Sequence, residues 1–241
     1  MKTDRKGRRA ARLVIACIAS MAIGAQAVPI VFMNSQYDTT ALALSGALAD
    51  VQSDVSPPSA LPLLSQAVVV GVNDFAASAA FASSGLLFTQ AEADSFAGAA
   101  GAYAVAQSHF VGSILGNGRL NLHFGFDNLN SIIGDGQADG VLFVLLSNTL
   151  GGVTTTLYNN AFISGGPIDL EFDVPVGGIS NLDLLLLSEA ITAEGSAQSG
   201  QNFAEVTFSG TIGEPAAIPV PATPLLVITA LVLMRTSRRK Q

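Results

Sequence analysis

The sequence has almost no cysteine. Of its 241 residues only Cys17 is a cysteine, and it lies in the apolar stretch that follows the basic N-terminal residues. Because we expect cleavage after Ala27, the mature chain would carry no thiol. This excludes a disulfide scaffold, a zinc–thiolate site and a thiol enzyme.

Basic residues are almost absent from the middle of the chain. Between Arg12 and Arg235 only Arg119 is basic, whereas seventeen acids lie between Asp38 and Glu214, so this stretch has a net charge of 1 − 17 = −16. A protein that displaces phosphate counterions needs Lys and Arg in its folded domain, so nucleic-acid binding is excluded. Such an acidic domain repels its own copies at low salt, which suggests calcium-dependent self-association as a hypothesis.

Motifs of the common hydrolases are also missing. The chain has two histidines, His109 and His123, and no Gly-x-Ser-x-Gly, His-Glu-x-x-His or phosphate-binding glycine motif. Asp169, Glu171 and Asp173 alternate along one predicted strand, and successive carboxylates would lie about 7 Å apart, a distance compatible with a glycosidase pair. Acids on a solvated strand face more commonly provide solubility and edge protection. We therefore expect no enzymatic activity.

The N-terminus has the three parts of a secretory signal peptide. Six basic residues in the first twelve positions precede an apolar stretch over residues 13–24, and Ala25-Gln26-Ala27 has the small residues that signal peptidase cleaves. About twelve apolar residues are too few for a membrane span, which needs about twenty. We predict a signal peptide over residues 1–27, with an uncleaved anchor as the alternative.

The C-terminus combines a proline motif, a short apolar segment and a basic tail. No charge appears between Glu214 and Arg235, and the unbroken apolar part, residues 225–234, is about 15 Å long if helical. We predict a marginal transmembrane helix over residues 222–234 and a basic tail over residues 235–241. The tail would stop transfer and stay in the cytoplasm through four residues: Arg235, Arg238, Arg239 and Lys240.

Residues 218–241 resemble the PEP-CTERM sorting signal of exported proteins in Gram-negative bacteria that make exopolysaccharide. Pro219, Pro221, Ala222 and Thr223 match the usual Val-Pro-Glu-Pro-Ala-Thr motif, and Val220 stands at the position of Glu. The resemblance implies that an exosortase processes an inner-membrane intermediate, after which the chain reaches the cell surface or the medium. A plain C-terminal anchor is the alternative.

The region between these signals has the pattern of a β-sandwich. Residues 120–126, 168–174 and 204–212 alternate between apolar and polar side chains, and glycine-rich turns separate them. This predicts an all-β, antiparallel β-sandwich or jelly-roll-like domain over residues 28–212, followed by a linker over residues 213–217.

Several segments of this domain are less regular. The continuously apolar residues 141–146 predict a strand covered on both faces, and residues 182–188 suit either such a strand or a short buried helix. The stretch from residue 75 to 107, rich in Ala and Ser, predicts strands with small side chains. A helix is allowed around residues 39–50.

One loop has the beginning of a metal motif. Asp135, Gln137 and Asp139 begin like the calcium loop Asp-x-Asp-x-Asp-Gly, although Leu146 stands where the full loop has a bidentate Glu. Calcium is thus a possible cofactor, and a polar turn without metal is the alternative. Three nearby side chains would offer a different oxygen cage: Asp127, Asn128 and Asn130.

The same stretch has a second interpretation. Residues 138–144 resemble the Ala-Asp-Gly-apolar strand of legume-type lectins, which implies that Asp139 reaches a sugar directly.

Together these patterns suggest an exported structural or adhesive protein of an exopolysaccharide-rich envelope or biofilm. The alternative is a calcium-dependent, lectin-like carbohydrate-binding module. The expected partners are an exosortase, exopolysaccharide or a second copy of the chain, with transient attachment to the inner membrane.

Overall fold

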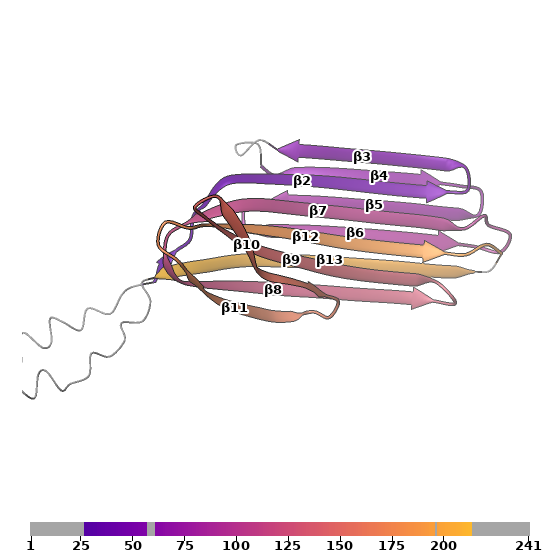
Figure 1. Cartoon of the computed structure of the whole chain (residues 1–241). Helices are drawn as coiled ribbons and strands as arrows, with labels where there is room; N and C mark the ends of the chain where they lie inside the picture. The colour runs from indigo at the N-terminus through magenta and orange to yellow at the C-terminus, as the bar shows by residue number, and fades with distance from the viewer. Residues whose placement is uncertain (1–26, 57–60, 196, 214–241) are drawn as a thin grey trace, which may run out of the picture. The chain divides into compact units, whose positions relative to one another are not determined.

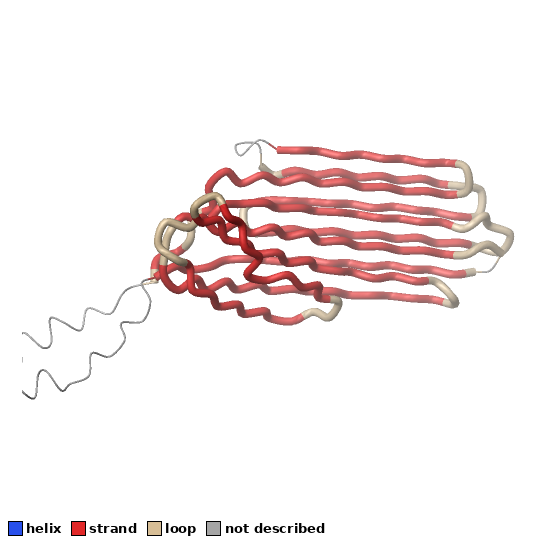
Figure 2. The backbone as a smooth tube through the Cα atoms, in the orientation of Figure 1, coloured by secondary structure: helices blue, strands red, loops and turns tan. Residues whose placement is uncertain are grey.

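The structure, a computed structural model, describes residues 27–56, 61–195 and 197–213. These residues form thirteen strands joined by turns (Figure 2). The sorting motif, the predicted segments 222–234 and 235–241, and the signal peptide apart from Ala27 lie outside the described residues. Within the described part, no helix is long and apolar enough to cross a membrane.

The strands form two antiparallel sheets that stack on each other (Figure 1). Sheet A has the order β11-β8-β13-β6-β5-β4, with β1 also beside β13, and sheet B has the order β10-β9-β12-β7-β2-β3. Sheet A contains β1 (Val28–Pro29), β4 (Leu63–Val70), β5 (Asp74–Ser83), β6 (Leu86–Ser95), β8 (Gly118–Ile133), β11 (Gly166–Val174) and β13 (Gln198–Gly213). Sheet B contains β2 (Phe32–Ser45), β3 (Leu48–Ser56), β7 (Ala102–Leu115), β9 (Gln137–Leu150), β10 (Val153–Phe162) and β12 (Ile179–Thr192).

The last eight strands have the order of a jelly roll. When β6 to β13 are numbered one to eight, sheet A runs 1-8-3-6 and sheet B runs 2-7-4-5. Strands β2 to β5 extend both sheets on one side. The two-residue β9–β10 hairpin turns at Gly151 and Gly152, whose φ values of +59° and +81° suit a type I′ turn. The predicted all-β antiparallel sandwich is confirmed.

The core changes from large to small side chains along the strands. One cluster contains Phe110, Phe124, Leu142 and other large residues, whereas a second contains nine alanines and Val69. Alanine projects little, so serine and threonine hydroxyls reach across the interface between the sheets. Ser78 donates to the backbone oxygen of Leu42 at 2.9 Å. The predicted small-residue strands between residues 75 and 107 are therefore confirmed as β5, β6 and β7.

Two expectations for local structure were wrong. Residues 39–50 form the β2–β3 hairpin instead of a helix, because Ala41 and Ala43 are fully buried with a period of two. Residues 141–146 form a strand as predicted, in β9, but within the described residues it is covered on one face instead of two. Residues 182–188 belong to β12, so of the two alternatives left open there the strand is confirmed. In the described part of the chain only the even-numbered side chains of β9 enter the core, and Phe143 faces outward with 42% exposure.

The β4 edge of sheet A is protected against further pairing. The backbone N–H of Val68 on β4 donates to Asp50 Oδ2 at 3.0 Å, and the N–H of Gln66 donates to Gln52 Oε1 at 3.4 Å. Side chains of β3, at the edge of sheet B, thus occupy backbone N–H donors of β4, at the edge of sheet A. Inward-pointing polar side chains at an edge hinder the addition of another strand.

Candidate functional site

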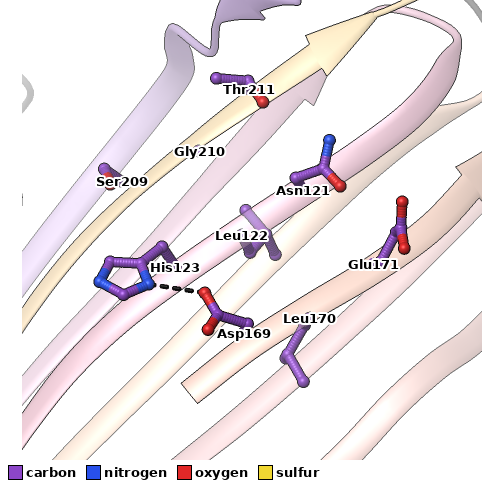
Figure 3. A pocket seen from close by; sticks show the side chains of 9 residues that line it. All are labelled: Asn121, Leu122, His123, Asp169, Leu170, Glu171, Ser209, Gly210 and Thr211. Carbon is purple, nitrogen blue, oxygen red and sulfur yellow. Dashed lines mark hydrogen bonds and ion pairs between the residues drawn. The ribbon is translucent and has the colours of Figure 1, made fainter. Parts of the chain in front are cut away.

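A shallow groove of about 370 Å³ lies on the outer face of sheet A, over β8, β11 and β13 (Figure 3). It forms because β8 pairs with both other strands, so that their outward side chains lie in cross-strand rows. One row is Ser209, His123 and Asp169, and the next is Thr211, Asn121 and Glu171. The groove therefore presents hydroxyl, amide, imidazole and carboxylate groups side by side.

Each carboxylate at the centre of this groove has a positively charged or hydrogen-bonding neighbour. His123 Nδ1 and Asp169 Oδ1 are 2.7 Å apart, and the Arg119 guanidinium forms an ion pair with Glu171. The side chains of His123 and Asp169 remain 57% and 79% exposed. The alternating acids of β11 thus lie where the sequence predicted, on an outward strand face. Their cross-strand partners leave them accessible to a ligand.

The geometry does not favour catalysis at these residues. Ser209, His123 and Asp169 follow the order of a nucleophile, a base and its orienting acid, but an acyl-transfer site needs donors for an oxyanion in a water-excluded pocket. Here the row lies in an open groove. A glycosidase acid also needs burial to hold its proton, whereas Asp169 and Glu171 are 79% and 49% exposed. These groups suit hydrogen bonding to a ligand.

The same outer face continues into two smaller hollows that the sequence did not predict. One, of about 180 Å³, lies between Gln66 and Gln90, and the other, of about 270 Å³, lies between Gln90 and Phe203. The Phe203 ring meets the Phe88 ring edge to face, with centroids 4.8 Å apart. Amide groups beside an outward aromatic pair resemble the lining of small-molecule sites, where few polar groups orient a ligand against apolar surface.

The calcium-loop residues do not converge in the structure. Asp135 lies in the β8–β9 turn, and Gln137 and Asp139 project from β9 on the outer face of sheet B, where Asp139 lies opposite Glu189. Among the described residues, no three His, Cys, Asp or Glu side chains are placed to hold a metal ion. The lectin-like strand likewise places Asp139 on sheet B, away from the groove on sheet A.

The neighbouring asparagines form a hydrogen-bond cluster that runs from the fully buried Asn202 to the exposed Asn130. Asn128 Nδ2 donates to the backbone oxygens of Gly140 and Ile163, at 2.9 and 2.7 Å. The side-chain amide of the fully buried Asn202 donates to Asn128 Oδ1 at 2.6 Å and to Asn130 Oδ1. The amide oxygens proposed for a cation cage therefore accept hydrogen bonds within the protein, and the cluster ties sheet A to sheet B.

A second polar cluster lies on the outer face of sheet B. His109 on β7 contacts two carboxylates, with Nδ1 2.9 Å from Asp38 Oδ2 and Nε2 2.8 Å from Asp183 Oδ1. The hydrogen bond to Asp183 raises the pKa of His109 to about 9, against desolvation, and Asp38 adds to the increase. The imidazole is therefore protonated at neutral pH and donates both of its N–H groups.

This cluster makes stability depend on pH. Because the pKa of His109 rises from 6.5 unfolded to about 9 folded, the stabilisation is complete below pH 6.5 and is lost as the pH rises to 9. The full pKa difference corresponds to about 3 kcal/mol, but the Asp183 side chain is 40% exposed. We therefore expect a loss of about 1–2 kcal/mol between pH 6 and 9.5 in urea unfolding. His109→Gln should remove most of this slope; an unchanged slope would contradict the assignment.

Comparisons with known proteins leave the family open. No protein-family model matches the chain, and no curated protein matches it. Among solved structures, the chain is similar to the family 11 carbohydrate-binding module of Clostridium thermocellum, solved with a β-1,3-1,4-mixed-linked tetrasaccharide. The TM-score is 0.23 and the identity 13%, over 80% of this chain and 98% of that one.

A second similar structure is the module TmCBM61 in complex with β-1,4-galactotriose. Its TM-score is 0.22 and its identity 9%, over 60% of this chain and 86% of that one. Likeness at this level assigns no function to the chain.

Proposed function

We propose that the chain is an exported, non-catalytic β-sandwich that binds polysaccharide on the outer face of sheet A. The observation that carries the proposal is the open groove over β8, β11 and β13, with its two rows of hydrogen-bonding side chains. Sugar hydroxyls both donate and accept hydrogen bonds, so a binding site needs groups of both kinds. Glu171 and Asp169 offer acceptors, Arg119 offers donors, and the Asn121 amide offers both.

The arrangement of the hollows favours a polymer over a small ligand. The groove and the two amide-lined hollows lie on the same face of sheet A, and neighbouring strands are about 4.8 Å apart. The hollows lie about six residues along β8 and β13 from the groove, at the row of Leu129 and Phe203, or roughly 20 Å away, so a track that joins them runs obliquely across the strands. A chain of several sugar units can thus cross the strands and contact successive rows.

The charge of this face selects among polymers. Asp169, Glu171 and Asp173 line the outer side of β11, and Arg119 is the sole basic residue of the acidic central stretch. An acidic polysaccharide would be repelled at low salt. We therefore propose a neutral or amino-sugar-containing polymer as the ligand, in keeping with an adhesive role in an extracellular matrix.

Substitutions in the groove provide the test. Asn121→Ala with His123→Ala removes two ligand-facing groups at outward positions, and each lost hydrogen bond is worth about 0.5–1.5 kcal/mol. We expect affinity for a bound neutral polysaccharide to fall about 5- to 150-fold in affinity electrophoresis. The control is Gln107→Ala on the outer face of sheet B, which should bind normally. Equal binding by both variants would contradict the proposed site.

The binding assay, repeated on the wild-type protein with a chelator, separates calcium-dependent binding from direct binding. The calcium-dependent version of the proposal predicts that a chelator abolishes the interaction. Binding that persists in chelator would leave the polar groove as sufficient on its own. If no polysaccharide in a panel of neutral, acidic and amino-sugar polymers binds, the carbohydrate proposal fails and a purely structural role is favoured.

Export and sorting are part of the proposal. The basis is the signal-peptide pattern and the proline, apolar and basic order of residues 218–241. We propose processing by an exosortase near Pro219 to Thr223, after an inner-membrane stage. Mass spectrometry of surface or secreted protein should give a C-terminus within or close to that motif. Recovery of chains that still end in Gln241 would overturn it.

A further inference from the structure

Apolar side chains form cross-strand rows on the outer face of sheet B. On β9 and β12, Phe143 lies opposite Leu185, and Val141 lies opposite Leu187. Toward the other edge, one cross-strand row also consists of apolar residues, namely Val51, Leu42 and Val105. None of these side chains belongs to either core cluster, because the opposite-facing residues of the same strands fill the core.

The sequence of these strands is typical of burial on both faces. Residues 141–146 are apolar without interruption, as are residues 184–187, whereas strands with one solvated face normally alternate. Sheet A covers only the inner face of β9 and β12 in the described part of the chain. The outward side of these two runs therefore has the composition of a covered surface and lacks a cover within that part.

Most charged groups on this face are already paired. Asp38 and Asp183 flank the protonated His109. Burial raises the pKa of Tyr103, and Glu189, which accepts a hydrogen bond from its hydroxyl, raises it further. Such internal pairing lowers the cost of bringing a second surface against this face, because fewer unpaired charges lose water.

We propose that the outer face of sheet B is an interface between two copies of this chain, stacked face to face about a two-fold axis. Two sheets of the same twist pack with their strands nearly aligned, so each copy is complementary to the other. Six strands of about 12 residues give a face of roughly 1,200 Å². This exceeds the ~800 Å² per partner that a standard stable interface buries.

The proposal of a dimer depends on sheet B alone. The cross-linking of polymers that a dimer would allow rests on the proposed function. Side chains of β3 occupy two backbone donors of β4, so strand addition at that edge of sheet A is disfavoured. Stacking through sheet B leaves the two sheet A faces on opposite sides of the dimer. A dimer of polysaccharide-binding chains would thus cross-link two polymer chains and gain avidity.

The test uses the compact unit Ala27–Gly213 in sedimentation equilibrium. We expect the wild-type protein to have twice the monomer mass at micromolar concentration. Leu185→Glu with Leu187→Glu places charges at outward positions of β12, and the dissociation constant of the dimer should rise at least about 100-fold. The matched control is Leu64→Glu with Val70→Glu, at outward positions of β4 in sheet A, and it should remain dimeric.

Three results would overturn the interface. The first is a wild-type protein that still has the monomer mass at 100 µM. The second is that both double variants form dimers with the same dissociation constant. Binding of the wild-type monomer to lipid vesicles, lost in the Leu185/Leu187 variant, would assign the face to a membrane. Circular dichroism and urea unfolding must show that the variants fold. Polysaccharide affinity measured on the monomeric variant keeps failure of the dimer distinct from failure of the groove.

Discussion

Phe110→Ala should lower the free energy of unfolding by about 3–5 kcal/mol, the usual cost of emptying a buried aromatic site. Phe110 is fully buried on β7 in sheet B. Its ring lies 5.0 Å from the Phe32 ring, 4.8 Å from Tyr37 and 4.7 Å from Phe208, measured between centroids. Phe208 belongs to β13 in sheet A, so the substitution leaves a cavity between the two sheets.

Urea unfolding followed by circular dichroism measures this effect. The matched control is Phe96→Ala, because Phe96 lies in the β6–β7 connection and is 60% exposed. We expect the control to change the free energy of unfolding by less than about 0.5–1 kcal/mol. If the two variants are equally stable, the aromatic cluster around Phe110 is not the centre of the core.

Gly200→Val is the second large effect, with an expected loss of about 3 kcal/mol or more, the upper range for overpacking. An added Cβ at Gly200 would clash with the backbone oxygen of Gln137 and lie 3.1 Å from its carbonyl carbon. Gly136 meets the backbone of Ser199 in the same way. The backbones of β13 and the start of β9 therefore touch directly, and no side chain can yield to make room.

Thermal and urea unfolding of Gly200→Val and Ser199→Ala tests this contact. Ser199 is the adjacent residue of β13 and faces outward, so its variant should stay within about 0.5 kcal/mol of the wild type. Gly200→Ala should fall between the two. A valine variant as stable as the wild type would mean that the sheets are not in contact at this point.

The sequence predicts strands well wherever one face is buried and the other is charged. In residues 168–174, Ile168, Leu170 and Phe172 alternate with acids, and β11 has that pattern of exposure. The helix allowed around residues 39–50 was wrong. Alanine favours helices in isolation, but here Ala41 and Ala43 are buried as small inward side chains of a strand. Local propensity does not reveal that a facing sheet needs small residues.

The candidate site could be predicted only in part. The alternating pattern within each strand predicted that Asp169, Glu171 and His123 face outward. Their side chains lie together only because β8 is between β11 and β13, which the sequence did not predict. His123 and Asp169 are 46 residues apart, and no local pattern joins them. The cluster around His109 has the same origin, since Asp38 and Asp183 are 71 and 74 residues away.

We expect polysaccharide to bind the outer face of sheet A. Nuclear magnetic resonance of the side-chain amide groups tests it directly, because outward amides lie on both sheets. On titration with a neutral or amino-sugar oligosaccharide, the signals of Asn121 and Gln90 should shift, and those of Gln107 on sheet B should stay in place. Shifts confined to Gln107 and Asn181, or no shift with any neutral, acidic or amino-sugar oligosaccharide, would contradict the account.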